Sequence, residues 1–228
     1  DQMKALCDMI HEVDPAIRIY SSTWRHCPEW NGHLDIWGVG HYGCFPVAEM
    51  HARRAAGERL WFTTDGQMCT DTPFNAVERL LPHYCFKYGA DAYEFWGVSW
   101  FTYDPWRFGW HRYIHQSSTP GESYYVRYPN GDGYLLYPGR PVGIDGPVST
   151  VRLEAARDGV EDYDYLLLLK TLAEKTRDPE AERLLADFAA LLDIPNAGGR
   201  YSTRILPDPT RLAALRLRAG AAIERLSR

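Results

Sequence analysis

Four short β-type runs alternate with helical segments in the first hundred residues, and this alternation limits the possible folds more than any other feature of the chain. Strands that alternate with helices favour βα units and a parallel sheet. Four such units amount to half of a (β/α)₈ barrel, which normally takes about 250 residues. The β-type runs are Ile17–Ser21, His33–Val39, Arg59–Thr64 and Asp91–Val98, and helical patterns occupy Met3–Val13, Ala48–Ala56 and Phe74–Tyr88.

We therefore predict an α/β fold of the (β/α)₈ TIM-barrel type, in which this chain forms the C-terminal half of the barrel. The helical stripe before the first strand is what a chain entered midway through a barrel would show. The alternative is a small, complete α/β sheet.

The pattern changes after Trp100. An aromatic loop over Phe101–Gln116 is followed by two β-like stretches within Gly121–Tyr137, and then by three amphipathic helices. We predict that residues 1–148 form the barrel half with its loop and hairpin, and that residues 149–228 form a helical segment packed on it. The predicted helices are Ser149–Lys175 with a possible break at Gly159, a helix from Pro179 to about Leu192 that Asp178 caps, and one from Asp208 to about Leu226.

Composition excludes several classes of protein. The 228 residues carry a net charge of −5, which predicts neither nucleic acid nor an anionic membrane surface as a partner. Apolar runs fall short of the roughly 20 residues that a spanning helix needs. The chain begins at Asp1 without Met or a signal peptide, so we expect that the native N-terminus is not shown. The sequence carries no signal for localisation or oligomeric state.

The five cysteines lie in no CxxC pair and fit no zinc template, so we expect no metal and no cofactor. An odd count argues against a complete disulfide framework. Small apolar fillers are the favoured interpretation. One bridge between loops, from Cys27 to Cys44 or Cys69, is the alternative.

Aromatic residues are concentrated in one segment. Fifteen of them lie within the 45 residues from Tyr93 to Tyr137, close to half of the chain's total. A core does not need so many rings with polar tips, whereas a wet cleft lined with rings does. A pyranose ring can stack its C–H face on such rings while its hydroxyls seek carboxylates. The candidates for a sugar platform of this kind are Trp37, Tyr42, Trp96 and Trp100.

Carboxylates stand beside tryptophans in two of the predicted strands. Asp35 shares a face with Trp37, and Glu94 shares a face with Trp96. Asp65 follows the third strand directly, at the rim where barrel enzymes place their sites. Glycoside hydrolysis usually needs two carboxylates, and the candidates in this chain are Asp35, Asp65 and Glu94. A hydrogen bond to Arg or backbone is the alternative role for Asp35 and Glu94.

The predicted substrate-binding residues border this rim. We expect Asp35 and Glu94 to point into the barrel, and Asp65 is the in-chain candidate for catalysis. Packing is the favoured role for Trp37 and Trp61, and a plain hairpin turn is the alternative for Asp132 in its Gly-flanked loop. The predicted substrate-binding set is Tyr42, Asp65, Trp96, Trp100, Asp132 and Tyr134.

Two motifs carry the most specific signal in the chain. Gly131–Gly139 reads GDGYLLYPG, and Ser149–Leu169 reads STVRLEAARDGVEDYDYLLLL. The second is a helical segment with charged residues from Arg152 to Asp162 on one side and a Leu run on the other. The favoured role of the charged side is an ion-pair network that locks this helix to the barrel.

Together with the weaker LDIWGVG and YEFWGVSWF, these motifs resemble the C-terminal half of the catalytic region of glycoside hydrolase family 123. The resemblance implies a (β/α)₈ barrel and a β-N-acetylgalactosaminidase-like activity with retention. The nucleophile in that family is the substrate's own acetamido group, an exception to the two-carboxylate scheme. An adjacent Asp-Glu pair serves it: Asp orients the acetamido group and Glu is the acid/base.

The resemblance also implies where that pair belongs. In the family it follows the fourth strand, a point that would lie before Asp1 here. Adjacent acids occur in this chain only at Glu161-Asp162, in the reverse order. We therefore expect a glycoside hydrolase acting on a β-linked N-acetylhexosaminide, with a carbohydrate substrate and a catalytic pair outside this chain. The alternative is a carbohydrate-binding protein on a barrel-like scaffold without an acid/base.

Overall fold

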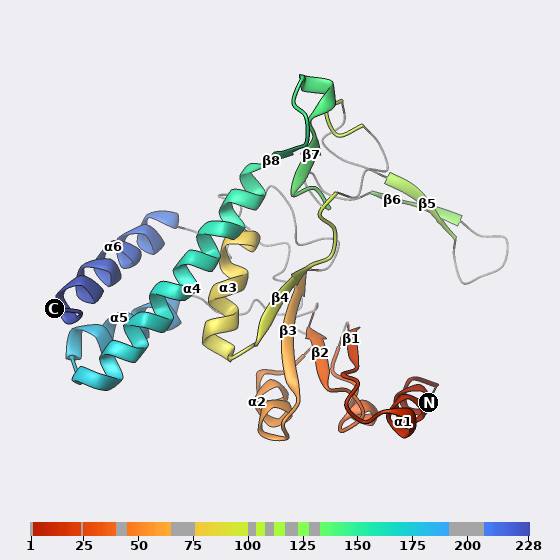
Figure 1. Cartoon of the computed structure of the whole chain (residues 1–228), viewed down its shortest axis with the longest axis horizontal. Coiled ribbons are helices and arrows are strands. Elements are labelled where there is room, and N and C mark those ends of the chain that lie inside the picture. Colours follow the sequence, from red (N-terminus) through yellow and green to blue (C-terminus); the bar gives the residue numbers. More distant parts are fainter. Residues whose placement is uncertain are drawn as a thin grey trace.

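The computed structural model describes residues 2–23, 25–39, 45–64, 76–99, 104–107, 112–116, 123–127, 133–191 and 208–228. In its first half, helices and strands alternate as the sequence predicts (Figure 1). The elements are α1 Gln2–Val13, β1 Tyr20–Thr23, the 3₁₀ helix η1 Pro28–Trp30, β2 Ile36–Val39, α2 Val47–Ala55, β3 Arg59–Thr64, α3 Ala76–Tyr88 and β4 Ala92–Phe95.

The four strands form one parallel sheet in the order β1-β2-β3-β4. Ser22 pairs with Gly38, Gly38 with Trp61, and Thr63 with Glu94, so the residues of each row face the same side. The predicted order and direction of the strands are confirmed. Within the described residues the sheet is open, with β1 and β4 at its edges, so a closed barrel is not observed.

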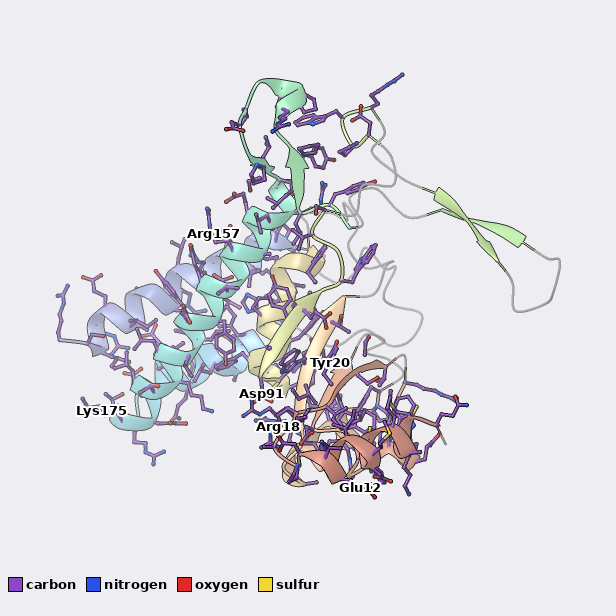
Figure 2. All side chains as sticks on the ribbon, turned by 45° about the vertical axis from the view of Figure 1, so that its right-hand side comes forward. Glu12, Arg18, Tyr20, Asp91, Arg157 and Lys175 are labelled. Atoms are coloured by element: carbon purple, nitrogen blue, oxygen red, sulfur yellow. The ribbon has the colours of Figure 1, made fainter. Side chains whose placement is uncertain are left out.

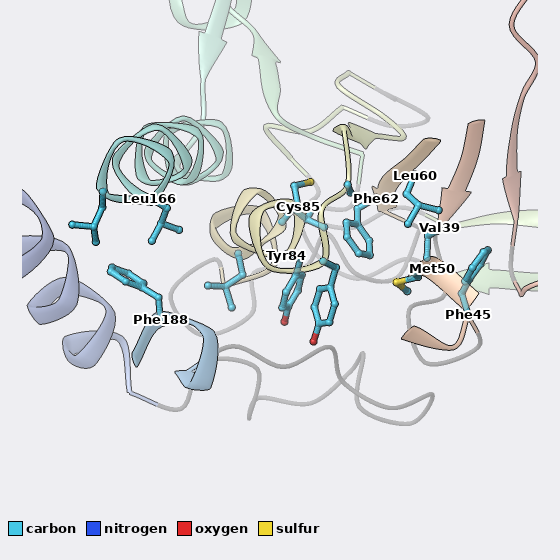
Figure 3. Packing of buried hydrophobic residues seen from close by; sticks show 14 of the residues in the cluster. Val39, Phe45, Met50, Leu60, Phe62, Tyr84, Cys85, Leu166 and Phe188 are labelled. Carbon is cyan, nitrogen blue, oxygen red and sulfur yellow. The ribbon is translucent and has the colours of Figure 1, made fainter. Parts of the chain in front are cut away.

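One face of the sheet is covered by helices. Leu60 and Phe62 of β3 are completely buried, and the ring of Phe62 lies 6.3 Å from Tyr84 and 6.2 Å from Tyr88 on α3. Met50 of α2 packs into the same cluster (Figure 3). Alternate residues of these strands are apolar because every second side chain points to the helix-covered face. The hydrophobic core therefore lies between the sheet and α2 and α3, and the same buried cluster continues into the helices after residue 150.

The C-terminal helices α4 Val151–Thr176, α5 Pro179–Leu191 and α6 Pro209–Leu226 pack on α3 and on each other. The possible break at Gly159 is wrong, because α4 is continuous. A Cβ at Gly159 would lie 2.5 Å from the carbonyl oxygen of Arg79, so this glycine lets α4 and α3 approach closely. The caps predicted at Asp178 and Asp208 are confirmed, since their carboxylates accept from the amides of Ala181 and Thr210.

In the sequence, two small hairpins follow the sheet and precede the C-terminal helices. β5 Arg112–Gln116 pairs antiparallel with β6 Ser123–Arg127, and β7 Leu136–Pro138 pairs antiparallel with β8 Pro147–Ser149. The predicted β-like stretches correspond to β6 and β7. β5 lies in a stretch that we predicted to be loop.

Three cysteines are described, and Cys7, Cys27 and Cys85 are all free thiols. The predicted alternative of a bridge from Cys27 is therefore not observed, and Cys44 and Cys69 lie outside the described residues. Cys7 and Cys85 belong to the buried apolar cluster, as fillers do. Among the described helices, none is both long and apolar enough to cross a membrane.

Candidate functional site

The face of the sheet opposite α2 and α3 carries polar and aromatic side chains, and we call it the polar face (Tyr20, Trp61, Thr63 and Glu94). The Tyr20 hydroxyl donates a hydrogen bond to Oε2 of Glu94, from one edge strand across the sheet to the other. The side chains of Ser22 and Thr63 also interact with this tyrosine and act to lower its pKa. Side chains from β1, β3 and β4 thus meet in one polar cluster, and this cluster lies over β2, which leaves room for it.

That space depends on Gly38 in β2. A Cβ on Gly38 would lie 2.4 Å from the Tyr20 hydroxyl oxygen and 2.8 Å from the Cα of Ser22. Any side chain there would push Tyr20 away from Glu94. The Tyr20 ring crosses over β2 instead and packs on Trp61, with ring centroids 5.2 Å apart. A sequence that puts Gly opposite Trp in neighbouring strands therefore makes room for the tyrosine.

Burial is the main reason why the pKa of Tyr20 is raised, and the hydrogen bond to the Glu94 carboxylate raises it further. Tyr20 therefore stays protonated and serves as a hydrogen-bond donor. Glu94 then has one oxygen engaged by Tyr20 and further lone pairs to accept from a ligand. A partly buried carboxylate, a fixed hydroxyl and an indole ring form a surface that suits a sugar.

Asp35 does not belong to this face, and the prediction that it points into the barrel is wrong. It precedes β2 at the end where the strands begin, and its carboxylate pairs with Arg18 at 2.8 Å and with His11 at 3.4 Å. Figure 2 labels Arg18 at that end of the sheet, where the chain approaches β1. Burial would raise the pKa of Asp35, but the hydrogen bond from the Ile19 amide and the charge of Arg18 outweigh it and lower the pKa. The alternative of a bond to Arg and backbone is the one observed.

Glu94 lies on the side opposite the helices, as predicted, because its neighbour Tyr93 packs against the helix-side core. Trp96 follows β4 directly and is half-buried. Trp37 is completely buried and donates its indole N–H to Glu58 at 2.7 Å, so the predicted packing role is confirmed.

Tyr134 is completely buried, and its ring lies edge-on to Tyr137 at 6.0 Å. Its backbone bridges to Ser99 in the segment after β4. The remaining predicted substrate-binding residues, Tyr42, Asp65, Trp100 and Asp132, lie outside the described residues.

The charged side of α4 makes the predicted ion-pair network. Asp162 is 2% exposed and binds Arg79 of α3 at 2.7 Å and Arg216 of α6 at 2.6 Å. The imidazole of His83 in α3 also bonds to it at 2.9 Å. Burial would raise the pKa of Asp162, yet the His83 hydrogen bond and the two arginines keep it below its ordinary value. The Glu161-Asp162 pair is therefore structural.

Reasoning from the sequence missed Tyr20, Ser22 and Thr63. The sequence around them shows no regular alternation of polar and apolar residues, and Glu94, which the Tyr20 hydroxyl binds, is 74 residues from Tyr20. Among the described residues, no group of three or more His, Cys, Asp or Glu side chains could hold a metal ion.

Comparison with known proteins identifies a family for most of the chain. Residues 1–169 match the family described as glycoside hydrolase 123, catalytic domain. No curated protein is significantly similar to the chain.

A similar fold occurs in a family 123 glycoside hydrolase from Clostridium perfringens, whose structural analysis concerned glycolipid glycan hydrolysis. The TM-score is 0.66 at 17% identity, and the match covers 99% of this chain and 40% of that one. The chain thus spans two fifths of this solved relative. Because the family match covers well over half of its residues, the chain belongs to the glycoside hydrolase family 123 catalytic domain family.

Proposed function

We propose that this chain is the C-terminal half of the catalytic region of a glycoside hydrolase, and that its polar face lines the substrate cleft. The family membership of residues 1–169 supports the class of enzyme. The observation that carries the proposal is the Tyr20–Glu94 pair beside Trp61, a polar and aromatic cluster on the face that α2 and α3 leave uncovered. Burying polar groups on a sheet costs free energy unless they are hydrogen-bonded, and Tyr20 and Glu94 meet this need through each other.

The proposed fold of the whole catalytic region is a (β/α)₈ barrel. Both edge strands, β1 and β4, have one neighbour within the described sheet. Preceding βα units of the same polypeptide would pair with these edges and turn the polar face inward. In such a barrel, substrates bind at the carboxyl ends of the strands, where Trp96 follows β4.

The proposed substrate is a β-linked N-acetylhexosaminide, N-acetylgalactosaminide-like, cleaved with retention by the substrate's acetamido group. The orienting Asp and the acid/base Glu would then be supplied by the segment that precedes this chain. Within this chain, Glu94 and Tyr20 would hold sugar hydroxyls, while Trp61 and Trp96 would pack against the C–H face of the ring. Tyr42, Asp65, Trp100 and Asp132 remain proposed rim residues, with Asp65 as the in-chain catalytic candidate.

The test is to assay the full-length gene product against a panel of aryl glycosides. We expect release of the aryl group from at least one N-acetyl-β-hexosaminide. An active enzyme on another sugar would refute the substrate and keep the class. Binding of hexosaminides without any hydrolysis would instead favour the alternative, a carbohydrate-binding protein without an acid/base.

Asp65→Asn in the same full-length protein tests the rim residue. This change keeps the shape of the side chain and removes its charge. A loss of turnover with folding intact would mark Asp65 as functional, and turnover like the parent's would remove it from the site.

A further inference from the structure

A hollow is lined by the segment after β4 and by the β7–β8 hairpin. In Figure 1 this hairpin lies at the upper end of the molecule. The volume of the hollow is about 430 Å³, within the range of small-molecule sites. The side chains that could recognise a ligand there are Ser99, Tyr137, Arg140 and Asp145. None of them belongs to the predicted site or to the polar face.

Arg140 and Asp145 stand on the two sides of the loop that joins β7 to β8. Among the described residues, neither side chain makes a hydrogen bond or an ion pair, even though both line the same hollow. Arginine only donates hydrogen bonds and an ionised aspartate only accepts them. An anion would suit Arg140 but would be repelled by Asp145. A neutral molecule rich in hydroxyl groups can use both.

The loop is held in one shape by its own backbone. The Gly139 amide donates to the Gly146 carbonyl at 3.0 Å, and the Ile144 amide donates to the Gly139 carbonyl at 3.0 Å. A Cβ on Gly139 would lie 2.2 Å from the Gly146 oxygen, so this close approach requires glycine. A loop fixed in this way presents Arg140 and Asp145 with little loss of entropy on binding.

Tyr137 is held just as firmly. Trp106 packs edge-on against its ring at 5.1 Å, while the indole N–H of Trp106 donates to the Pro138 carbonyl at 2.8 Å. The guanidinium of Arg152 lies 5.7 Å from the same ring. An aromatic ring with fixed position, next to an unpaired donor and an unpaired acceptor, is the combination that binds a sugar ring.

The hollow also has a fixed relation to the polar face. The amides of Leu135 and Leu136 donate to the Val98 carbonyl at 2.9 and 3.1 Å, which ties β7 to the segment that leaves β4. Ser99 is five residues after Glu94, so their Cα atoms lie no more than about 18 Å apart. A hollow at this distance is within the reach of an oligosaccharide that starts at the polar face.

We propose that the hollow formed by Ser99 and the β7–β8 hairpin is an additional carbohydrate-binding subsite, which takes a neutral sugar unit of the substrate beyond the bond that is cleaved. Hydroxyl groups of that unit donate to Asp145 and accept from Arg140, and its C–H face packs on Tyr137. The inference rests on the proposed function, since it assigns a role to a second part of the same substrate.

The experiment compares two substrates of the full-length gene product: the aryl N-acetyl-β-hexosaminide and a neutral oligosaccharide with the same terminal sugar. In Arg140→Ala, the lost hydrogen bond to a charged group should lower kcat/KM for the oligosaccharide about tenfold or more. Activity on the aryl glycoside should stay within about twofold of the parent, because that substrate does not reach the hollow. Asp145→Asn should show the same split.

Arg183→Ala is the matched control, because Arg183 is an exposed arginine on α5 away from the hollow. It should leave both substrates unchanged. An equal fall on both substrates in Arg140→Ala, or no fall on either, would overturn the subsite. Circular dichroism melts of each variant show whether folding is intact.

Failure of the proposed function would look different. If the parent cleaves neither substrate, hydrolysis is refuted, and the subsite is judged by calorimetric titration with the same oligosaccharide. Weaker binding by Arg140→Ala than by Arg183→Ala and the parent would uphold the subsite. Equal binding by all three proteins, or no binding by the parent, would refute it.

Discussion

The two faces of the four-stranded sheet are built from alternate residues of the same strands, yet they differ in kind. On the helix-covered face, Leu60 and Phe62 are completely buried against α2 and α3. On the polar face, Trp61 and Thr63 of the same strand lie beside Tyr20 and Glu94. Residues one position apart thus have different tasks: one set stabilises the fold, and the other forms the proposed sugar site. The contrast can be broken or sharpened by substitutions on each face.

The largest expected effect is on the helix-covered face. Phe62→Ala removes a completely buried ring that packs on Tyr84 and Tyr88, and it should lower the free energy of unfolding by about 3–5 kcal/mol. Denaturant unfolding measures this loss. A change below about 1 kcal/mol would mean that this face does not carry the stability of the sheet.

A buried charge behind the same face gives the next effect. Asp162→Asn leaves Arg79 and Arg216 without their shared carboxylate and should cost about 1–3 kcal/mol at neutral pH.

The direction in which this stability difference changes with pH follows from the lowered pKa of Asp162. Its contribution is complete above the ordinary value of 3.8 and is lost as pH falls through the lower folded-state pKa. The difference between parent and Asp162→Asn, measured by denaturant unfolding, should therefore shrink in acid below pH 3.8. A difference that grows as the pH falls would contradict this account of the network.

Gly38→Ala tests the space on which the polar face depends. Its Cβ would meet both the Tyr20 hydroxyl and the backbone at Ser22, so we expect a loss of about 1–3 kcal/mol and reduced glycoside turnover. Gly220→Ala is the control, because its Cβ would make only ordinary contact, at 3.4 Å from Tyr165. This helical position should be neutral or slightly stabilised. Parent-like stability and turnover in Gly38→Ala would show that Tyr20 does not need the space over Gly38.

A smaller effect on stability should come from Tyr20→Phe, at about 0.5–1.5 kcal/mol for one hydrogen bond. The raised pKa of Tyr20 gives this variant a signature in alkali. Above pH 10, the ordinary value, the unfolded chain loses this proton while the folded chain keeps it, so stability falls as pH rises. When the pH is raised from neutral to 10 and above, the free energy of unfolding should fall less in Tyr20→Phe than in the parent. Chemical unfolding at each pH measures this difference. Identical alkaline profiles would place Tyr20 in an ordinary exposed setting.

The comparison of the two faces also explains what could be predicted from the sequence. The strands and helices could be predicted because apolar periodicity is a local signal. The predicted order and direction of the strands are also confirmed. The first strand is observed at Tyr20–Thr23 instead of Ile17–Ser21 because so short a run has no sharp boundary signal.

Period-two reasoning placed Asp35 with Trp37 but could not tell which end of the sheet its carboxylate would reach. Arg18, just before β1, and His11 of α1 hold the Asp35 carboxylate at the amino ends of the strands. The Tyr20–Glu94 bond was missed because it joins the first and last strands, and only the finished sheet brings them together. Gly38 likewise gives no local sign that a tyrosine from the neighbouring strand crosses over it.

The most direct test of the central claim is turnover by Glu94→Gln in the full-length gene product, measured together with its unfolding. The substitution keeps the size of the side chain. It removes the negative charge of the carboxylate, which accepts hydrogen bonds from Tyr20 and, in our account, from the sugar. We predict a fall in kcat/KM on the aryl hexosaminide of about 10–100-fold. The free energy of unfolding should change by no more than about 1 kcal/mol, and Glu174→Gln, on the exposed side of α4, should change neither quantity. Parent-like turnover in Glu94→Gln, or a loss of activity that only follows a loss of folding, would contradict the assignment of the polar face to the substrate.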